Sequence, residues 1–147
     1  MNDITETYKG TVIADWYDRN GHMNVVSYLS IFDQATFLLL EKVGFTEEFI
    51  EESSITMVAS KLLSSHKKEM FLGDPINVLS GLISFDETFF TVTHRMKRNG
   101  VLTASCDIRM YPIHLKTRNR IAIPQSILNL CATFHIQGIK DSFQETL

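Results

Sequence analysis

The sequence contains little cysteine. Cys106 and Cys131 are the only two, and neither stands in a Cys-x-x-Cys pair or in a cluster of cysteine and histidine. That spacing provides neither a zinc ligand set nor a redox pair, so free thiols in a reducing compartment are expected. We therefore expect no metal, no redox role and no cofactor.

The sequence also lacks an excess of positive charge and any long apolar run. Its 14 Lys and Arg against 17 Asp and Glu give a formal net charge of −3, which speaks against nucleic acid as a partner. No apolar run approaches the roughly 20 residues that span a bilayer, and residues 1–6 lack the basic-then-apolar order of a secretory signal. A cytoplasmic protein with no membrane partner is expected.

The chain does have enough length and apolar content for one core. At 147 residues with 44% apolar side chains, it can bury a core without support from a metal or a disulfide. We expect a single domain over residues 1–147.

A long apolar helix is predicted in the first third of the chain, after a strand at 8–13 and a loop at 15–21. Apolar residues recur at helical spacing between Asn24, a suitable N-cap, and Gly44, a suitable left-handed residue after the last turn. Because apolar residues lie on most sides, we expect the helix to be mostly buried by a sheet that wraps around it.

The rest of the chain is predicted to be mainly sheet. After a short helix at 46–52 the apolar pattern changes to a period of two, and Asn99-Gly100 is a strong hairpin signal. The predicted elements are strands at 55–70, 75–84, 88–98 and 101–112, an edge segment at 121–123, and a helix at 125–134. One sheet face is apolar, and the other, with Thr91, Thr93 and Thr103, is expected to face water. The expected fold class is α+β, with a curved antiparallel sheet around one central helix.

The residues that could carry out a reaction gather just before the start of the long helix. Asp18 precedes the helix by a few residues, which places a carboxylate beside backbone N–H groups that lack helical partners. Anions and polarised carbonyls bind at such a position, so we interpret residues 15–44 as the active site.

The residues of this stretch resemble a known family. They read Trp16-Tyr17-Asp18-Arg19-Asn20-Gly21-His22-Met23-Asn24, continuing through Tyr28-Leu29 and Phe32-Asp33-Gln34-Ala35-Thr36. This pattern is similar to the signature of the hotdog-fold acyl-CoA thioesterases of the 4-hydroxybenzoyl-CoA type. Within them it looks closest to the carnitine-degradation branch, which includes betainyl-CoA thioesterases. Weaker similarity extends through Gly73-Asp74-Pro75 and residues 113–118.

The resemblance implies roles for several residues. Asp18 matches the family's catalytic carboxylate, acting either as a nucleophile on the thioester carbonyl or as a base for water. Val25 matches the position whose backbone N–H receives the thioester oxygen, and the first helical turn suits that task. His22 and Asn24 are secondary catalytic candidates. The substrate-binding candidates are Trp16, Tyr17, Gly21 and Tyr28.

Structural alternatives exist for the same residues. Asp18 can serve the loop alone, Asn24 can be a simple cap, and Asp33 is a rival acid because another hotdog branch carries its acid on the helix. Trp16 and Tyr17 can line an acyl pocket, or one of them can contact a quaternary ammonium by a cation–π interaction. The sequence also departs from the branch near His66, where a tyrosine is expected, and this puts a betaine-type substrate in doubt.

The implied activity is hydrolysis of an acyl-CoA to a free acid and CoA, in a homodimer or a tetramer of dimers. The candidates for binding the CoA phosphates are Lys67, Lys68, Arg95, Lys97, Arg98, Arg118 and Arg120. The alternative functions are a hotdog protein that binds acyl-CoA or an apolar ligand without turnover, and a hydratase or dehydratase that uses His22 with Asp33.

Overall fold

The computed structural model describes residues 4–143, so the first three residues of the segment inspected for a secretory signal lie outside it. The strands are β1 (Thr5–Thr11), β2 (Ile55–His66), β3 (Pro75–Phe85), β4 (Phe90–Arg98) and β5 (Val101–His114). The helices are η1 (Ala14–Trp16), α1 (Val25–Lys42), α2 (Glu47–Ser53), α3 (Gln125–Cys131) and η2 (Ala132–Phe134). Among these residues no helix is long and apolar enough to cross a bilayer.

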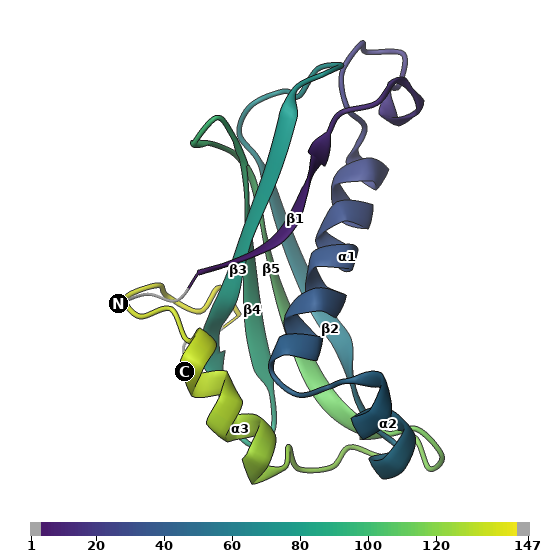
Figure 1. Ribbon diagram of the computed structural model, residues 1–147, viewed down its shortest axis with the longest axis vertical. Coiled ribbons are helices and arrows are strands. Elements are labelled where there is room, and N and C mark those ends of the chain that lie inside the picture. The colour runs from purple at the N-terminus through teal and green to yellow at the C-terminus, as the bar shows by residue number, and fades with distance from the viewer. Residues whose placement is uncertain (1–3, 144–147) are drawn as a thin grey trace.

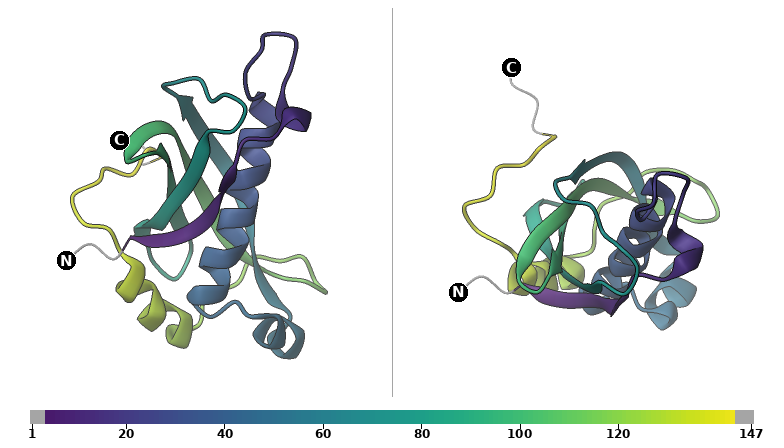
Figure 2. Two further views of the ribbon diagram at one scale, coloured as in Figure 1. Left: turned by 45° about the horizontal axis from the view of Figure 1, so that its top comes forward. Right: turned by 90° about the horizontal axis from the view of Figure 1, so that it is seen from above.

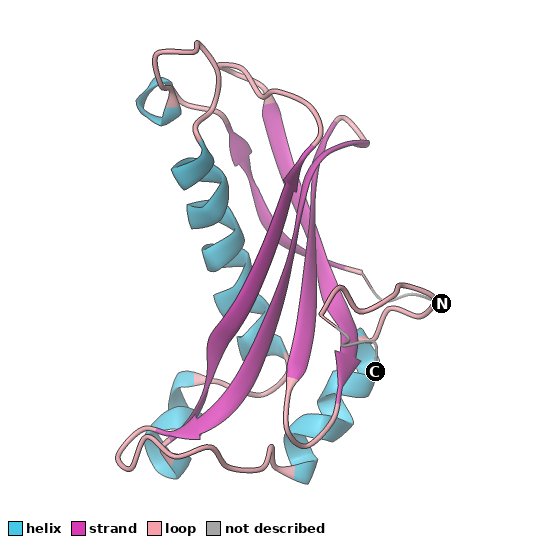
Figure 3. Ribbon diagram, turned by 180° about the vertical axis from the view of Figure 1, so that it is seen from behind, coloured by secondary structure: helices cyan, strands magenta, loops and turns pink. Residues whose placement is uncertain are grey.

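The five strands form one antiparallel sheet in the order β1-β3-β4-β5-β2. The β4–β5 turn places Asn99 and Gly100 at φ 51° and 79°, the left-handed pair that a tight type I′ hairpin requires. Helix α1 runs along one face of the sheet, and α2 lies at the end of α1 away from the 13–24 loop (Figures 1 and 3). This arrangement confirms the expected α+β class.

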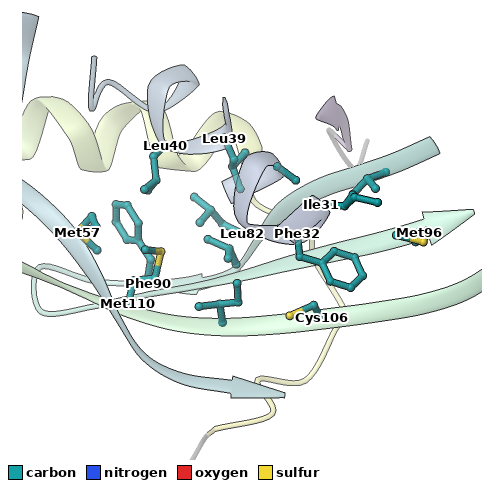
Figure 4. Close-up of a cluster of buried hydrophobic side chains, with 14 of the residues drawn as sticks. Ile31, Phe32, Leu39, Leu40, Met57, Leu82, Phe90, Met96, Cys106 and Met110 are labelled. Carbon is teal, nitrogen blue, oxygen red and sulfur yellow. The ribbon is translucent and has the colours of Figure 1, made fainter. Parts of the chain in front are cut away.

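The core lies between α1 and the sheet. Phe32 and Leu39 from the helix meet Leu82, Phe90 and Cys106 from the strands (Figure 4), and all five are fully buried. Burying such side chains contributes roughly 1.5–3 kcal/mol each, so this layer supplies the main force that fixes α1 on the sheet.

A buried polar chain joins the middle of α1 to the sheet. His94 on β4 is fully buried, with Nε2 at 2.8 Å from Thr36 Oγ1 and Nδ1 at 2.5 Å from Ser80 Oγ. Thr36 Oγ1 donates to the carbonyl of Phe32 at 2.9 Å, so it accepts from His94, which defines the Nε2–H tautomer. Burial lowers the pKa of His94 to about 3, and the imidazole is therefore neutral.

The expected burial of α1 is only partly correct. Its inner stripe is buried, but four apolar side chains are exposed, namely Val25, Val26, Phe37 and Leu38. The curved sheet covers the inner side of the helix, and the outward side stays open (Figure 2). The apolar side chains of α1 divide into a core-facing set and an outward set.

The expectation that the second sheet face is wet was wrong at Thr91, Thr93 and Thr103, which are all fully buried. At Thr91 the cause is the C-terminal segment, because Asp141 accepts hydrogen bonds from Thr91 Oγ1 at 2.9 Å and from Arg109. The alternation of polar and apolar residues within a strand cannot predict this burial, because the segment that covers Thr91 comes from a distant part of the chain.

Several element ends also differ from the prediction. The first strand covers Thr5–Thr11 instead of 8–13, β2 ends at His66 rather than at 70, and no strand forms at 121–123 within the described residues. In that last region there is only a single bridge between Ile113 and Arg120. The final helix ends at Cys131 and tightens into a 3-10 turn, since its last carbonyls are satisfied by closer bonds.

Candidate functional site

The loop before α1 is held in a defined turn around Asp18. The backbone N–H of Asn20 donates to Asp18 Oδ1 at 2.7 Å, and the N–H of Gly21 donates to the Asp18 carbonyl at 3.2 Å. Gly21 has φ +78°, which suits a residue without a side chain. The carboxylate is solvent-exposed, and the turn occupies one of its two oxygens.

The start of α1 is fixed by a cap and by the loop. The side chain of Asn24 accepts from the N–H of Ser27 at 2.8 Å, which confirms Asn24 as the N-cap. Its own N–H donates to the carbonyl of Trp16 at 2.8 Å. Val25 is therefore the first helical residue, and its N–H has no partner within the helix.

A small pocket of about 170 Å³ opens at this helix start. It is lined by His22, Val25 and Tyr28 from the loop and helix, and by His66, Lys67, Lys68 and Glu69 from the end of β2 and the segment after it. Three predicted site residues, His22 from the loop and Val25 and Tyr28 from the first turn of α1, therefore meet in one cavity.

The wall of the pocket is an aromatic pair. The rings of Tyr28 and His66 meet edge to face, with centroids 4.5 Å apart. Burial lowers the pKa of His66 and raises the pKa of Tyr28, so both side chains favour their neutral forms near pH 7. His66 thus occupies a position against the helix tyrosine, and its ring forms part of the cavity.

The segment after β2 is tied down beside the loop. Arg98 donates from Nη1 to Asp74 Oδ2 at 2.9 Å and to the carbonyl of Glu69 at 3.0 Å. The N–H of Met23 donates to the carbonyl of Met70 at 2.9 Å. These contacts hold the 67–74 segment against the loop, so the pocket has two fixed walls.

The other predicted site residues do not line this pocket. Asp18 and Gly21 lie in the turn before it, and Trp16 packs partly buried against the core. Tyr17 accepts a hydrogen bond at its hydroxyl from the N–H of Leu72, which ties it to the 67–74 segment. Asp33 lies on the exposed side of α1.

The basic residues proposed for the CoA phosphates separate into groups. Lys67 and Lys68 line the pocket, whereas Arg98 is paired with Asp74 and Arg120 stacks on Tyr111 at 3.8 Å in another cavity. Sequence reasoning missed Glu69 as a pocket residue. Its only sequence signal was its place next to Lys67 and Lys68.

A second, larger cavity lies at the opposite end of α1. This cavity, called here the α1–α2 groove, has a volume of about 710 Å³ and an apolar floor that includes Phe37, Phe45 and Ile50. Three carboxylates stand along it, those of Glu41, Glu47 and Glu51, with Ser54, Leu115 and Lys116 completing the lining.

A family model described as the thioesterase-like superfamily matches residues 12–130. The match covers well over half of the sequence. The chain belongs to the thioesterase-like superfamily. The matched residues include the loop, α1 and all strands from β2 to β5. The α+β architecture described above is therefore that of a hotdog thioesterase.

Two curated relatives of this thioesterase-like protein carry substrate names. Betainyl-CoA thioesterase of Pseudomonas aeruginosa is 24% identical over 96 residues, covering 65% of this chain and 60% of that protein. L-carnitine dehydrogenase/betainyl-CoA thioesterase of Ruegeria pomeroyi is 27% identical over 123 residues, covering 82% of this chain and 25% of that protein. The chain therefore spans less than two thirds of the length of either relative.

Solved structures share the fold of this chain. A Staphylococcus aureus protein solved in complex with CoA matches with a TM-score of 0.84 and 20% identity, over 99% of this chain and 92% of that one. At this identity the similarity establishes the arrangement of the elements.

Proposed function

We propose that this protein hydrolyses an acyl-CoA thioester to a free acid and CoA at the pocket that begins α1. The observation that carries the proposal is the helix start itself, where Val25, whose N–H has no partner within the helix, lines a cavity next to a loop with a fixed carboxylate. Membership of the thioesterase-like superfamily and relatives named for betainyl-CoA support the same reaction.

Asp18 is the proposed catalytic carboxylate. As a base it takes a proton from water, whose oxygen attacks the thioester carbonyl and releases the CoA thiolate. As a nucleophile it forms an anhydride with the acyl group, and water then cleaves that anhydride. The turn at Asn20 orients the carboxylate through one oxygen, so the other remains for water or for the carbonyl.

Val25 is the proposed donor to the oxyanion. Its N–H stands at the positive end of an 18-residue helix, where negative charge that develops on the thioester oxygen is stabilised. Asn24 holds this turn in place through its cap. His22 presents its ring to the pocket, and its Nδ1 lies 3.0 Å from the carbonyl of Met23.

The lysines at the mouth of the pocket are proposed to bind the phosphates of CoA. Lys67 and Lys68 are exposed and line the same cavity as Val25, so an anionic chain of the substrate can reach them from the reacting carbon. The Staphylococcus aureus protein of the same fold was solved in complex with CoA, which is consistent with CoA as the carrier.

A homodimer is proposed as the working form. Within the described residues β2 pairs on one side only, with β5, and the exposed stretch of that strand includes Leu62 and Leu63, each about half exposed. An open apolar edge strand is a surface for pairing with another chain. Antiparallel pairing of two β2 strands gives a two-fold dimer, in which one surface meets itself.

The acyl group is proposed to be short, and a betainyl-type cation is the leading candidate. A cavity of about 170 Å³ holds a few heavy atoms beyond the carbonyl, and both curated relatives are named for betainyl-CoA.

The experiment is a hydrolysis assay of the purified protein over a panel of acyl-CoAs, with short, long, aromatic and cationic acyl groups. Release of one CoA thiol and one free acid per turnover is expected, with the highest kcat/KM among the short groups. Saturable binding of acyl-CoA without thiol release on any substrate would contradict the proposal and would favour a binding protein.

A further inference from the structure

His66 lines the pocket at the start of α1, and no role has been assigned to it. We propose that His66 is the general base that removes a proton from the water that attacks the acyl group. The proposal rests on the proposed thioesterase function and deepens it, because a proton acceptor at the end of β2 leaves Asp18 the role of nucleophile.

The His66 ring is held in place by contacts on two sides. It meets the Tyr28 ring edge to face, with centroids 4.5 Å apart, and its Nε2 lies 2.8 Å from Ser64 Oγ on the same strand. The chain directly after the ring is also fixed, because the N–H groups of Lys67 and Lys68 donate to the carbonyl of Thr103 at 2.8 and 3.1 Å. The imidazole is therefore positioned before a substrate binds.

One nitrogen of the ring has a hydrogen-bond partner and the other has none. Within residues 4–143, Nδ1 of His66 has no partner, whereas Nε2 has the hydroxyl of Ser64. A proton taken up at Nδ1 gives an imidazolium whose Nε2–H donates to that hydroxyl. Ser64 thus stabilises the charged form that the reaction produces, as a third group does for other catalytic histidines.

The surroundings of His66 favour the neutral ring before the reaction. Partial burial lowers the pKa of His66 below its ordinary value of 6.5, so at pH 7 the ring can accept a proton. The titratable and charged groups that line the same cavity are Tyr28 on α1, His22 on the loop, and Lys67, Lys68 and Glu69 after the strand. The lysines oppose a positive charge on the ring and the glutamate favours it. On β5 the paired residue is Ala104, which carries no charge.

His66 and the proposed oxyanion donor come from different walls of the pocket. Val25 and His22 belong to the loop and the helix, whereas His66 ends β2. A carbonyl whose oxygen is bound at the N–H of Val25 has its carbon further into the cavity, toward the wall formed by β2. Water attacks that carbon, so a base on the β2 wall can take its proton. His22 lies on the wall of the donor, and its Nδ1 already bonds to the carbonyl of Met23 at 3.0 Å.

The reaction balances with His66 as the base. Asp18 attacks the thioester carbonyl, the C–S bond breaks, and CoA leaves as a thiolate while an anhydride forms. Water then attacks the anhydride, one of its protons moves to Nδ1 of His66, and the free acid and the Asp18 carboxylate are released. The imidazolium passes this proton to the CoA thiolate. The net reaction consumes one water and yields one acid and one CoA thiol.

The test removes the nitrogen atoms of His66 and keeps the side chain's other contacts. His66→Phe retains a ring against Tyr28 but cannot accept a proton, and His66→Gln retains a polar partner for Ser64 and does not titrate. We expect kcat on the best acyl-CoA to fall about 100-fold at pH 7.5 in both variants. His114→Gln is the matched control and keeps wild-type kcat, because His114 pairs with Ile55 at the other end of β2, outside the pocket.

The pH dependence of kcat separates a base from a packing residue. A base must be neutral to act, so wild-type kcat should fall about tenfold per pH unit on the acid side of the pKa of His66, which lies below 6.5. Between pH 5 and 8 the two variants should lack this dependence. The same dependence in both variants would belong to another group and would overturn the proposal.

Rapid-mixing measurements of CoA release locate the affected step. In His66→Phe and His66→Gln, one CoA per active site should appear in a burst before the slow steady state, because formation of the anhydride needs no water. Asp18→Asn should give no burst. Loss of kcat without a burst in the two His66 variants would mean that acyl transfer itself is lost, which would overturn the proposal.

Failure of this inference and failure of the proposed function give different results. Wild-type kcat in both His66 variants overturns the role of His66 and leaves the proposed function standing. Absence of turnover by the wild-type protein on every acyl-CoA overturns the proposed function and this inference together.

Discussion

The two ends of α1 differ in how they are built and in how visible they are in the sequence. The N-terminal end carries a small pocket with lysines at its mouth, and its residues follow one another in a compact motif. The C-terminal end carries a groove four times larger by volume, about 710 Å³ against about 170 Å³, lined by carboxylates that belong to no motif. The proposed reaction site is thus formed by residues close together in the sequence, whereas the groove is lined by residues from segments that are distant in it.

The largest effect is expected from removing one backbone donor at the N-terminal end. Val25→Pro deletes the N–H of the first helical residue, and proline suits that position because Asn24 is already extended at φ −80°, ψ 159°. We expect kcat to fall by about 10²–10³-fold with little change in stability. Val25→Ala keeps the N–H and serves as the control. Equal kcat for both variants, measured by CoA release, would remove Val25 from the mechanism.

The next effect concerns His94 on β4, which is hydrogen-bonded to Thr36 in the middle of α1. His94 is neutral in the fold, with a pKa of about 3, and it gains a proton on unfolding below its ordinary value of 6.5. The unfolded state therefore binds more protons, and the free energy of unfolding should fall by about 1.4 kcal/mol per pH unit between pH 6.5 and 3.

Urea titrations over this pH range measure the slope, and His94→Gln provides the comparison because glutamine does not titrate. The same slope in the variant would assign the acid sensitivity to other groups.

A smaller effect is expected from replacing the N-cap residues of α1 and α2, and kcat should distinguish the two replacements. Asn24 and Thr46 accept hydrogen bonds from the N–H groups of Ser27 and Phe49, at 2.8 and 3.1 Å. Replacement of either by alanine should cost about 1 kcal/mol of stability. Only Asn24→Ala should also lower kcat, because only that cap positions Val25. A matching loss of kcat in Thr46→Ala would show that turnover follows stability rather than site geometry.

The smallest effect is expected at the lysines. The double variant Lys67→Ala, Lys68→Ala should raise KM for acyl-CoAs about two- to fivefold at low salt, with the difference shrinking as salt is added. Lys140→Ala, in the C-terminal segment, is the control and keeps KM. An unchanged KM in the double variant would move the phosphate site elsewhere.

The sequence predicted what depends on local pattern. The cap at Asn24, the glycine with positive φ after α1 and the hairpin at Asn99-Gly100 all appear in the fold. It did not predict the cover of Thr91 by Asp141, or the contact of His66 with Tyr28, because these join segments that are distant in sequence. The exposure of Phe37 could not be predicted either, since helical spacing does not tell which apolar side of α1 the sheet covers.

Asp18 is the residue on which the proposed reaction depends most. We expect kcat of Asp18→Asn, measured by CoA release from the best acyl-CoA of the panel, to be at least about 100-fold below that of the wild type. Asp15→Asn, three residues earlier in the same region, should keep wild-type kcat. Full activity of Asp18→Asn would contradict the assignment of the catalytic carboxylate.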